Sequence, residues 1–153
     1  MMFIRPATQS DADTLAPLFR AFFDEDGIDT PTDAIAANLR KMLADDRACI
    51  FVIAVDGQIA GFASGILTFG VEFGCAAELE DLYVCPQYRG RGWARPLLAA
   101  VLQWAEAQGA SETILIITPE AEADQSLTRF YSKFGFKESR RITMYRSNFL
   151  SGG

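Results

Sequence analysis

Hydrophobic residues recur at helical spacing in four segments of the chain. The first segment follows the capping pattern Thr8-x-x-Asp11, and its apolar positions are Leu15, Leu18, Phe19, Phe22 and Phe23. The same kind of spacing predicts further helices over residues 31–44, 92–108 and 124–134. A proline begins the second helix, and Gly109 and Gly135 end the third and the fourth.

Runs of β-branched, aromatic and other apolar residues separate these helices. They predict strands over residues 3–5, 49–55, 58–69, 75–84, 113–118, 136–138 and 142–146. Because segment 113–118 is almost continuously apolar, we expect it in the centre of a sheet. The order β-α-α-β-β-β-α-β-α-β-β predicts an α+β fold, with a central twisted mixed sheet and about four flanking helices.

One strand breaks the usual alternation of faces. In a regular strand over residues 78–84, Leu79 and Leu82 would face opposite sides of the sheet. A β-bulge near Asp81 would bring Leu79, Leu82 and Val84 to one face. The alternative is a strand that is buried on both faces and has no preferred parity.

Composition limits the size and the environment of the protein. The chain has 153 residues, of which 50% are hydrophobic and 22% are charged, as in one globular domain with a single core. We place that domain over residues 1–150 and expect a disordered tail at 151–153. No apolar run is long enough to span a membrane, and the N-terminus does not resemble a signal peptide. A cytoplasmic protein without a membrane partner is therefore expected.

Composition also excludes several kinds of chemistry. The chain has no histidine, so Ser-His-Asp and Cys-His catalysis are excluded. Cys49, Cys75 and Cys85 lack the spacing of a zinc site, and we predict that they are reduced and that no metal binds. The net charge is -6 and no basic face is evident, which argues against a nucleic-acid partner.

A turn rich in glycine and arginine joins the strand that ends at Val84 to the helix predicted from Gly92. Arg89, Arg91 and Arg95 lie in this region without any acidic residue among them. Glycines let a ligand approach the backbone closely, and the unpaired N–H groups of a helix start bind anions. The segment therefore predicts a site for a phosphorylated ligand, unless it is a surface turn whose arginines are merely solvated.

The pattern Arg89-x-x-Gly92-x-Ala94 resembles the acetyl-CoA pyrophosphate loop of the GNAT superfamily of N-acetyltransferases. The predicted order of helices and strands resembles the GNAT fold over nearly the whole chain. The resemblance implies that acetyl-CoA is the co-substrate. It also implies contacts to acetyl-CoA from the preceding strand and from the loop, at Leu82, Tyr83, Val84, Arg89, Gly90, Arg91, Gly92, Trp93 and Ala94.

A second motif agrees with the first. Phe130-Tyr131-x-x-x-Gly135-Phe136 resembles a GNAT signature whose tyrosine hydroxyl lies near the sulfur of CoA. The resemblance implies that Tyr131 is the general acid, although a tyrosine at a helix end can also simply face water. Many family members carry an asparagine seven residues earlier that touches pantetheine. This chain has Asp124 there, and Ser126 is the other candidate for that contact.

Acetyl transfer to an amine also needs a base, because an alkylammonium has a pKa of roughly 10 and no lone pair. Glu80 is the favoured base by the resemblance, with Glu78, Asp81 or a water molecule as alternatives. The N–H of Leu82, freed by a bulge, would stabilise the oxyanion. The alternative is that these carboxylates only contact the acceptor or end the strand.

Acidic residues indicate the type of acceptor. Residues 48–88 contain five acids and neither lysine nor arginine, and the loop after the first helix adds Asp24, Glu25, Asp26 and Asp29. Such a rim favours a cationic amine: a polyamine, an aminoglycoside or a lysine-bearing peptide. A catalytically silent acyl-CoA-binding module is the alternative function. The sequence leaves a homodimer open, with the last strands as a candidate interface.

Overall fold

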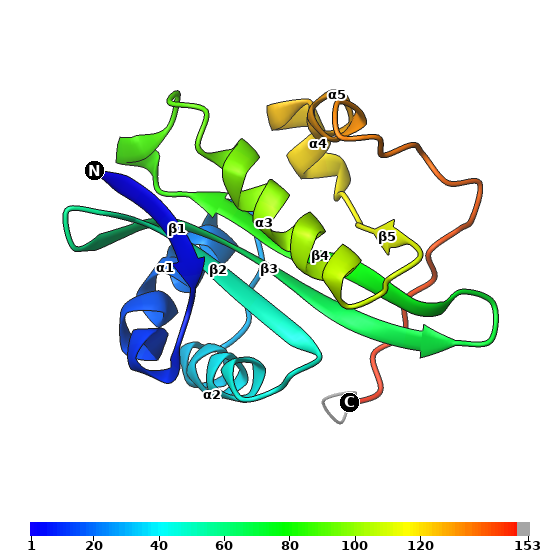
Figure 1. Ribbon diagram of the computed structural model, residues 1–153, viewed down its shortest axis with the longest axis horizontal. Helices are drawn as coiled ribbons and strands as arrows, with labels where there is room; N and C mark the ends of the chain where they lie inside the picture. The colour runs from blue at the N-terminus through cyan, green and yellow to red at the C-terminus, as the bar shows by residue number, and fades with distance from the viewer. Residues whose placement is uncertain (150–153) are drawn as a thin grey trace. The chain divides into compact units, whose positions relative to one another are not determined.

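The computed structural model describes residues 1–149 and divides into two compact units, Met1–Ile116 and Ile117–Gly153 (Figure 1). The first unit holds a 5-stranded sheet with the order β1-β2-β3-β4-β5. Its strands are β1 (Met2–Pro6), β2 (Ala48–Val55), β3 (Gln58–Gly70), β4 (Gly74–Val84) and β5 (Thr113–Ile114). The first four strands pair antiparallel, and β5 pairs parallel to β4. The α+β fold with a mixed sheet is therefore confirmed.

Helices cover both faces of this sheet. One face packs against α1 (Ala12–Glu25) and α2 (Thr32–Leu43), and the opposite face packs against α3 (Ala94–Ala107) (Figure 1). Two short 3-10 helices, η1 (Gln9–Asp11) and η2 (Pro86–Tyr88), precede α1 and α3. None of the helices in the described part of the chain has the length and hydrophobicity that a membrane span needs.

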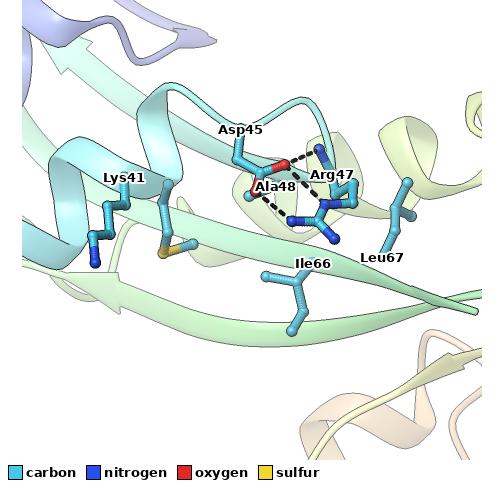
Figure 2. Close-up of a pocket in the computed structure, with 7 residues that line it drawn as sticks. Lys41, Asp45, Arg47, Ala48, Ile66 and Leu67 are labelled. Atoms are coloured by element: carbon cyan, nitrogen blue, oxygen red, sulfur yellow. Dashed lines mark hydrogen bonds and ion pairs between the residues drawn. The ribbon is translucent and has the colours of Figure 1, made fainter.

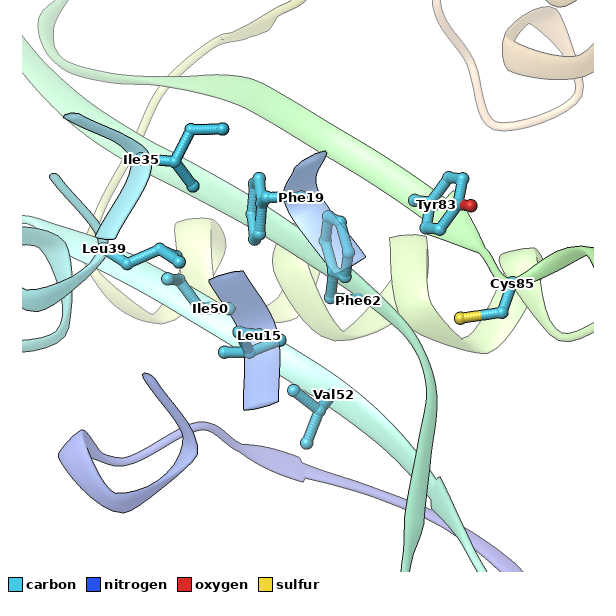
Figure 3. Packing of buried hydrophobic residues seen from close by; sticks show 9 residues of the cluster. All are labelled: Leu15, Phe19, Ile35, Leu39, Ile50, Val52, Phe62, Tyr83 and Cys85. Atoms are coloured by element: carbon cyan, nitrogen blue, oxygen red, sulfur yellow. The ribbon is translucent and has the colours of Figure 1, made fainter. Parts of the chain in front are cut away.

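An aromatic cluster fills the core beneath α1. Phe62 of β3 is fully buried, and its ring stacks on that of Phe19 with 4.0 Å between centroids (Figure 3). Phe22 and Tyr83 complete the contact between α1 and the sheet, with 5.1 Å between their ring centroids. Large buried rings contribute more free energy to burial than other side chains do, so this cluster fixes α1 on β3 and β4.

Two glycines let backbone and helix approach β3 closely on the other face. A Cβ added at Gly65 would lie 2.9 Å from Cγ1 of Val101 on α3, and one at Gly61 would lie 2.5 Å from the carbonyl oxygen of Tyr83. Neither position can hold a side chain without movement of its neighbours. Glycine within a strand often marks such a close approach.

The predicted bulge is present in β4. Ser64 of β3 pairs with Asp81, and the next residue, Gly65, pairs with Leu79, so Glu80 is the extra residue. Leu82 and Val84 pair with Ala63 and Gly61, which alternate with Gly65 along β3. The prediction that Leu79, Leu82 and Val84 share one face is thus confirmed, and that face is the one covered by α3.

The fifth strand differs from its prediction. Segment 113–118 was expected to be central, but only Thr113–Ile114 is a strand, and it lies at the edge of the described sheet. Its pairing ends at Glu78, just before the bulge at Glu80. A bulge bends its strand and breaks the hydrogen-bond ladder, so residues 115–118 have no straight partner to continue along. Ile114 and Ile116 are consequently 52% and 61% exposed.

The second unit contains α4 (Pro119–Gln125) and α5 (Leu127–Ser132). The prediction of a single helix over 124–134 was wrong. Ser126 adopts a left-handed conformation with a φ of 51° and separates two helices. The strands predicted over 136–138 and 142–146 are also absent: these residues have no regular secondary structure. Apolar side chains of these segments, among them Ile142 and Met144, are exposed. An apolar sequence pattern forms a strand only where a neighbouring strand is available to pair with it. The tail predicted at 151–153 lies outside the described residues.

Candidate active site

The bulge in β4 brings three carboxyl groups close together. Glu80, the residue without a partner on β3, is flanked by Glu78 and Asp81. Although Glu80 as a whole residue is exposed, its carboxyl is partly withdrawn from water. This burial, together with the negative charges of Glu78 and Asp81, raises the pKa of Glu80 to about 7. A carboxylate with such a pKa is suited to accept a proton near neutral pH.

Asp81 is held differently. Burial raises its pKa to about 6, while a hydrogen bond from the Ser64 hydroxyl to Oδ2, 2.6 Å long, acts in the opposite direction. Ser64 is fully buried, so this hydrogen bond satisfies two polar groups inside the sheet. Asp81 is therefore anchored to β3, whereas no hydrogen bond of this kind ties Glu80 to β3. The sequence contains no local signal for the Ser64–Asp81 pair, which only the register of β3 and β4 creates.

The loop between β4 and α3 has the backbone that an anion site needs. Gly90 and Gly92 have φ values of 81° and 77°, a left-handed conformation that side chains other than glycine rarely adopt. Gly92 therefore belongs to the turn, and α3 begins at Ala94 rather than at Gly92. No acidic residue occurs in the first turn of α3, so its N–H groups and its dipole favour an anion.

Two arginines of this loop have defined partners. Arg91 lies over two aromatic rings, 5.6 Å from the centroid of Tyr88 and 5.3 Å from that of Trp93. Arg89 instead donates from Nε to the carbonyl of Val84, at 2.8 Å, and from Nη2 to both carboxylate oxygens of Glu25, at 3.0 Å. Sequence reasoning missed the contact with Glu25, since the two residues lie 64 positions apart.

Leu82, Tyr83 and Val84 form the last part of β4. One edge of this segment pairs with β3, and within residues 1–149 no strand pairs with its other edge, because β5 reaches only Glu78. Backbone groups on that edge can bind an extended ligand. The side chain of Tyr83 points into the aromatic core, and its hydroxyl donates to Glu25 at 3.0 Å. Burial and this hydrogen bond raise the pKa of Tyr83 to about 12.

The other predicted site residues belong to the second unit. Tyr131 lies on α5, is buried, and packs against the rings of Phe130 and Phe136. Burial raises the pKa of its hydroxyl to about 12, so the group is protonated at neutral pH and can act as an acid. Asp124 on α4 and Ser126 at the junction of α4 and α5 are exposed.

A separate surface pocket of about 280 Å³ lies near the end of α2 and the adjoining strands. It is lined by Lys41, Met42, Asp45, Arg47, Ala48, Ile66 and Leu67. Figure 2 shows that Asp45 and Arg47 are joined by hydrogen bonds at its rim, with 2.9 Å between Asp45 Oδ2 and Arg47 Nη2. None of the predicted site residues lines this pocket. Among the described residues, no group of three or more Cys, Asp or Glu side chains has the arrangement of a metal site.

Comparison with known proteins gives a consistent result. The model of the acetyltransferase (GNAT) family matches residues 12–136, a range that spans both units. An aminoglycoside N(6')-acetyltransferase type 1 from Salmonella typhimurium is 32% identical over 120 residues, which is 76% of this chain and 81% of the relative. A protein of the same name from Stenotrophomonas maltophilia is 32% identical over 148 residues, 94% of this chain and 91% of the relative.

Solved structures resemble the chain over almost its full length. The aminoglycoside N-acetyltransferase AAC(6')-Iy in complex with CoA has a TM-score of 0.80 and 27% sequence identity, covering 97% of this chain and 96% of that chain. The structure of AAC(6')-Iy with the bisubstrate analogue CoA-S-monomethyl-acetylneamine gives the same TM-score and identity, covering 97% and 99%.

Proposed function

The chain belongs to the acetyltransferase (GNAT) family and is an N-acetyltransferase, and from this premise we propose that it transfers the acetyl group of acetyl-CoA to an amino group of an aminoglycoside. The bulge at Glu80 is the observation on which this proposal depends. It sets a carboxyl with a pKa of about 7 on the strand that leads into the glycine loop. The relatives that act on the N(6') position of aminoglycosides support the choice of acceptor.

The first unit supplies the glycine loop and the strand edge that bind acetyl-CoA. The pyrophosphate binds to backbone N–H groups of the turn at Gly90 and Gly92 and of the start of α3. Arg91 lies beside these groups. The unpaired edge of β4 at Leu82 and Val84 binds the amides of pantetheine. Asp124 and Ser126 are assigned to the same arm by resemblance to the family.

The reaction then needs one base and one acid. Glu80 removes a proton from the ammonium group of the acceptor, which frees the nitrogen lone pair to attack the thioester carbonyl. The N–H of Leu82 stabilises the negative oxygen that forms. The C–N bond forms, the C–S bond breaks, and Tyr131 gives its hydroxyl proton to the leaving thiolate. The second proton of the amine leaves to solvent, Glu80 then releases its proton and Tyr131 regains one from solvent, so the products are an amide, free CoA and one proton.

Acidic residues next to α1 favour a cationic acceptor. Arg20 holds the loop after α1 in place by donating to the carbonyl oxygens of Ile28 and Thr30. This loop presents Asp26 and Asp29, and burial together with the charge of Glu25 raises the pKa of Asp26. Several amino groups of an aminoglycoside are cationic at neutral pH, and such a rim attracts them.

The test is release of CoA thiol from acetyl-CoA by the purified chain with a panel of amines. Aminoglycosides with a 6'-amino group should release thiol, and matched aminoglycosides with a 6'-hydroxyl should release far less. Spermidine and a lysine-bearing peptide test the other two acceptor classes. Acetyl-CoA binding measured by calorimetry, without thiol release from any amine, would instead identify the silent acyl-CoA-binding module.

A further inference from the structure

One carboxylate connects the end of α1 to the loop before α3. Glu25, the last residue of α1, accepts two hydrogen bonds of 3.0 Å from Nη2 of Arg89 and one of 3.0 Å from the hydroxyl of Tyr83. The guanidinium of Arg89 also lies 5.4 Å from the centroid of the Tyr83 ring. Glu25, Arg89 and Tyr83, called here the Glu25 cluster, thus combine residues of α1, β4 and the loop.

The contacts of Arg89 differ from those of an arginine reserved for phosphate. Its Nε donates to the carbonyl of Val84 at 2.8 Å, and its Nη2 is engaged by Glu25. Both interactions tie the residue to protein groups that flank the loop. A direct contact with phosphate through Nη2 would require this fork of hydrogen bonds to open.

The neighbouring glycines explain why the loop needs such an anchor. Gly90 follows Arg89 directly, Gly92 lies two residues further on, and both have a positive φ. Glycine loses more backbone entropy than other residues when it is ordered, so an unanchored loop would sample many conformations. Because Glu25 and Arg89 are 39% and 46% exposed, their pair contributes little to global stability. Its effect is therefore expected in the local geometry of the loop rather than in the free energy of unfolding.

We propose that Arg89 is a positioning residue, held by Glu25, which orders the turn at Gly90 and Gly92 for acetyl-CoA rather than binding phosphate itself. The inference rests on the proposed function in one respect only, namely that acetyl-CoA is the ligand of this loop. The same cluster makes the loop after α1, which carries Asp26 and Asp29, continuous with the acetyl-CoA loop. Glu25 is then the residue of α1 that holds Arg89 in this position.

Calorimetric titration with acetyl-CoA distinguishes positioning from direct contact. Glu25→Ala and Arg89→Ala should each raise the Kd by a similar factor, roughly three- to tenfold, and the double variant should be no weaker than Arg89→Ala alone. Direct contact predicts the opposite for Glu25: its removal would release Arg89 toward the phosphate, so Glu25→Ala would bind as tightly as the wild type or more tightly. That result would overturn the inference.

Steady-state kinetics and a matched control separate this role from general damage. The KM for acetyl-CoA should rise in Glu25→Ala and in the isosteric Glu25→Gln, while kcat at saturating acetyl-CoA stays within about twofold. Asp13 lies on the same helix as Glu25, and Asp13→Ala, which breaks its exposed pair with Arg40 of α2, should change neither value. A fall of kcat with unchanged KM in the Glu25 variants would contradict the positioning role.

Hydrogen–deuterium exchange of the unliganded protein makes the test independent of the ligand. Amides of residues 85–93 should exchange faster in Glu25→Gln and Arg89→Ala than in the wild type or in Asp13→Ala. If the wild type binds no acetyl-CoA, the proposed function fails, yet the exchange data still decide whether the Glu25 cluster orders the loop. Unchanged exchange in both variants would refute the inference.

Discussion

Glu80 and Asp81 are adjacent in the chain, yet their carboxyl groups have different surroundings. Asp81 pairs across the sheet with the buried Ser64, which donates a hydrogen bond to it. Glu80 occupies the bulge, and partial burial of its carboxyl, together with the charges of Glu78 and Asp81, disfavours its charged form and raises its pKa. A single extra residue in β4 therefore separates an anchored acid from one that is free to exchange protons near pH 7.

The pH dependence of catalysis tests the role of Glu80. Because its pKa is raised to about 7, Glu80 is protonated and inactive as a base below that pH and active above it. We expect kcat/KM to rise with pH through about 7. Glu80→Gln should lower kcat/KM by about 100-fold or more and abolish this rise. Glu78→Gln is the control, and a lost pH dependence in that variant alone would identify Glu78 as the base.

Replacement of Tyr131 tests the acid. The hydroxyl, whose pKa is raised to about 12 by burial, is fully protonated at neutral pH, so Tyr131→Phe removes a proton donor and little volume. We expect kcat to fall by roughly 10- to 100-fold and the Kd for acetyl-CoA, from calorimetry, to change less than twofold. Tyr145→Phe, at an exposed tyrosine of the same unit, should leave both unchanged. Equal losses of affinity and turnover in Tyr131→Phe would rule out a role as general acid.

At the level of elements, β3 determines how closely α3 can approach the sheet. Gly65 lies under Val101, where an added Cβ would be 2.9 Å from the valine Cγ1. Since α3 begins directly after the loop that holds Gly90 and Gly92, a displaced helix would also displace the N–H groups at its start. The packing of β3 on α3 is thus coupled to the position of the N–H groups that we assign to the pyrophosphate.

Gly65→Ala should destabilise the protein by about 1–3 kcal/mol, because the extra methyl group forces Val101 or the backbone of β4 to move. Urea denaturation measures the change. Gly70→Ala is the matched control on the same strand, since nothing lies within 4 Å of its added Cβ. Equal stability of the two variants would show that α3 adjusts without strain.

At the level of the whole molecule, buried carboxyls give stability a defined dependence on pH. The pKa of Asp81 is raised from 3.8 to about 6, so between these values the folded protein keeps a proton that the unfolded chain has lost. The free energy of unfolding therefore falls as the pH rises through this window. Asp11 acts in the opposite sense: hydrogen bonds from Arg5 lower its pKa to about 2, and its contribution is lost as the pH falls from 3.8 toward 2.

Urea unfolding between pH 4 and 7 should show this effect. We expect a loss of roughly 1–3 kcal/mol across the range, and Asp81→Asn, which retains a partner for Ser64, should reduce the slope. Asp33→Asn, at an exposed carboxyl of α2, should leave the slope as in the wild type. A slope unaffected by Asp81→Asn would mean that other groups, with Glu80 the first candidate, carry the dependence.

Residue order alone was sufficient for the parts of the site that depend on local backbone geometry. The break in alternation between Leu79 and Leu82 predicted the bulge, and the glycines after Arg89 predicted a turn, in which Gly90 and Gly92 have positive φ angles. Both are properties of a few consecutive residues. The mixed sheet and the order of its first elements followed from periodicity for the same reason.

Predictions failed where an element needs a distant partner. Segment 113–118 is apolar enough for a central strand, but strand length depends on the neighbour, and β4 bends at the bulge after only two paired residues. Segments 136–138 and 142–146 alternate in the manner of strands and yet form none. Cytoplasmic location, a homodimer and a single domain over residues 1–150 remain predictions.

The sequence by itself determined the helices α1 to α3, the bulge and the glycine turn, because hydrophobic period, strand parity and glycine freedom act over a few residues. Only the tertiary structure decided that Ser64 holds Asp81 and that Glu25 faces Arg89. These contacts join residues 17 and 64 positions apart. The register of β3 and β4 creates the first contact, and the packing of α1 on the sheet creates the second. No local pattern of side chains encodes either contact.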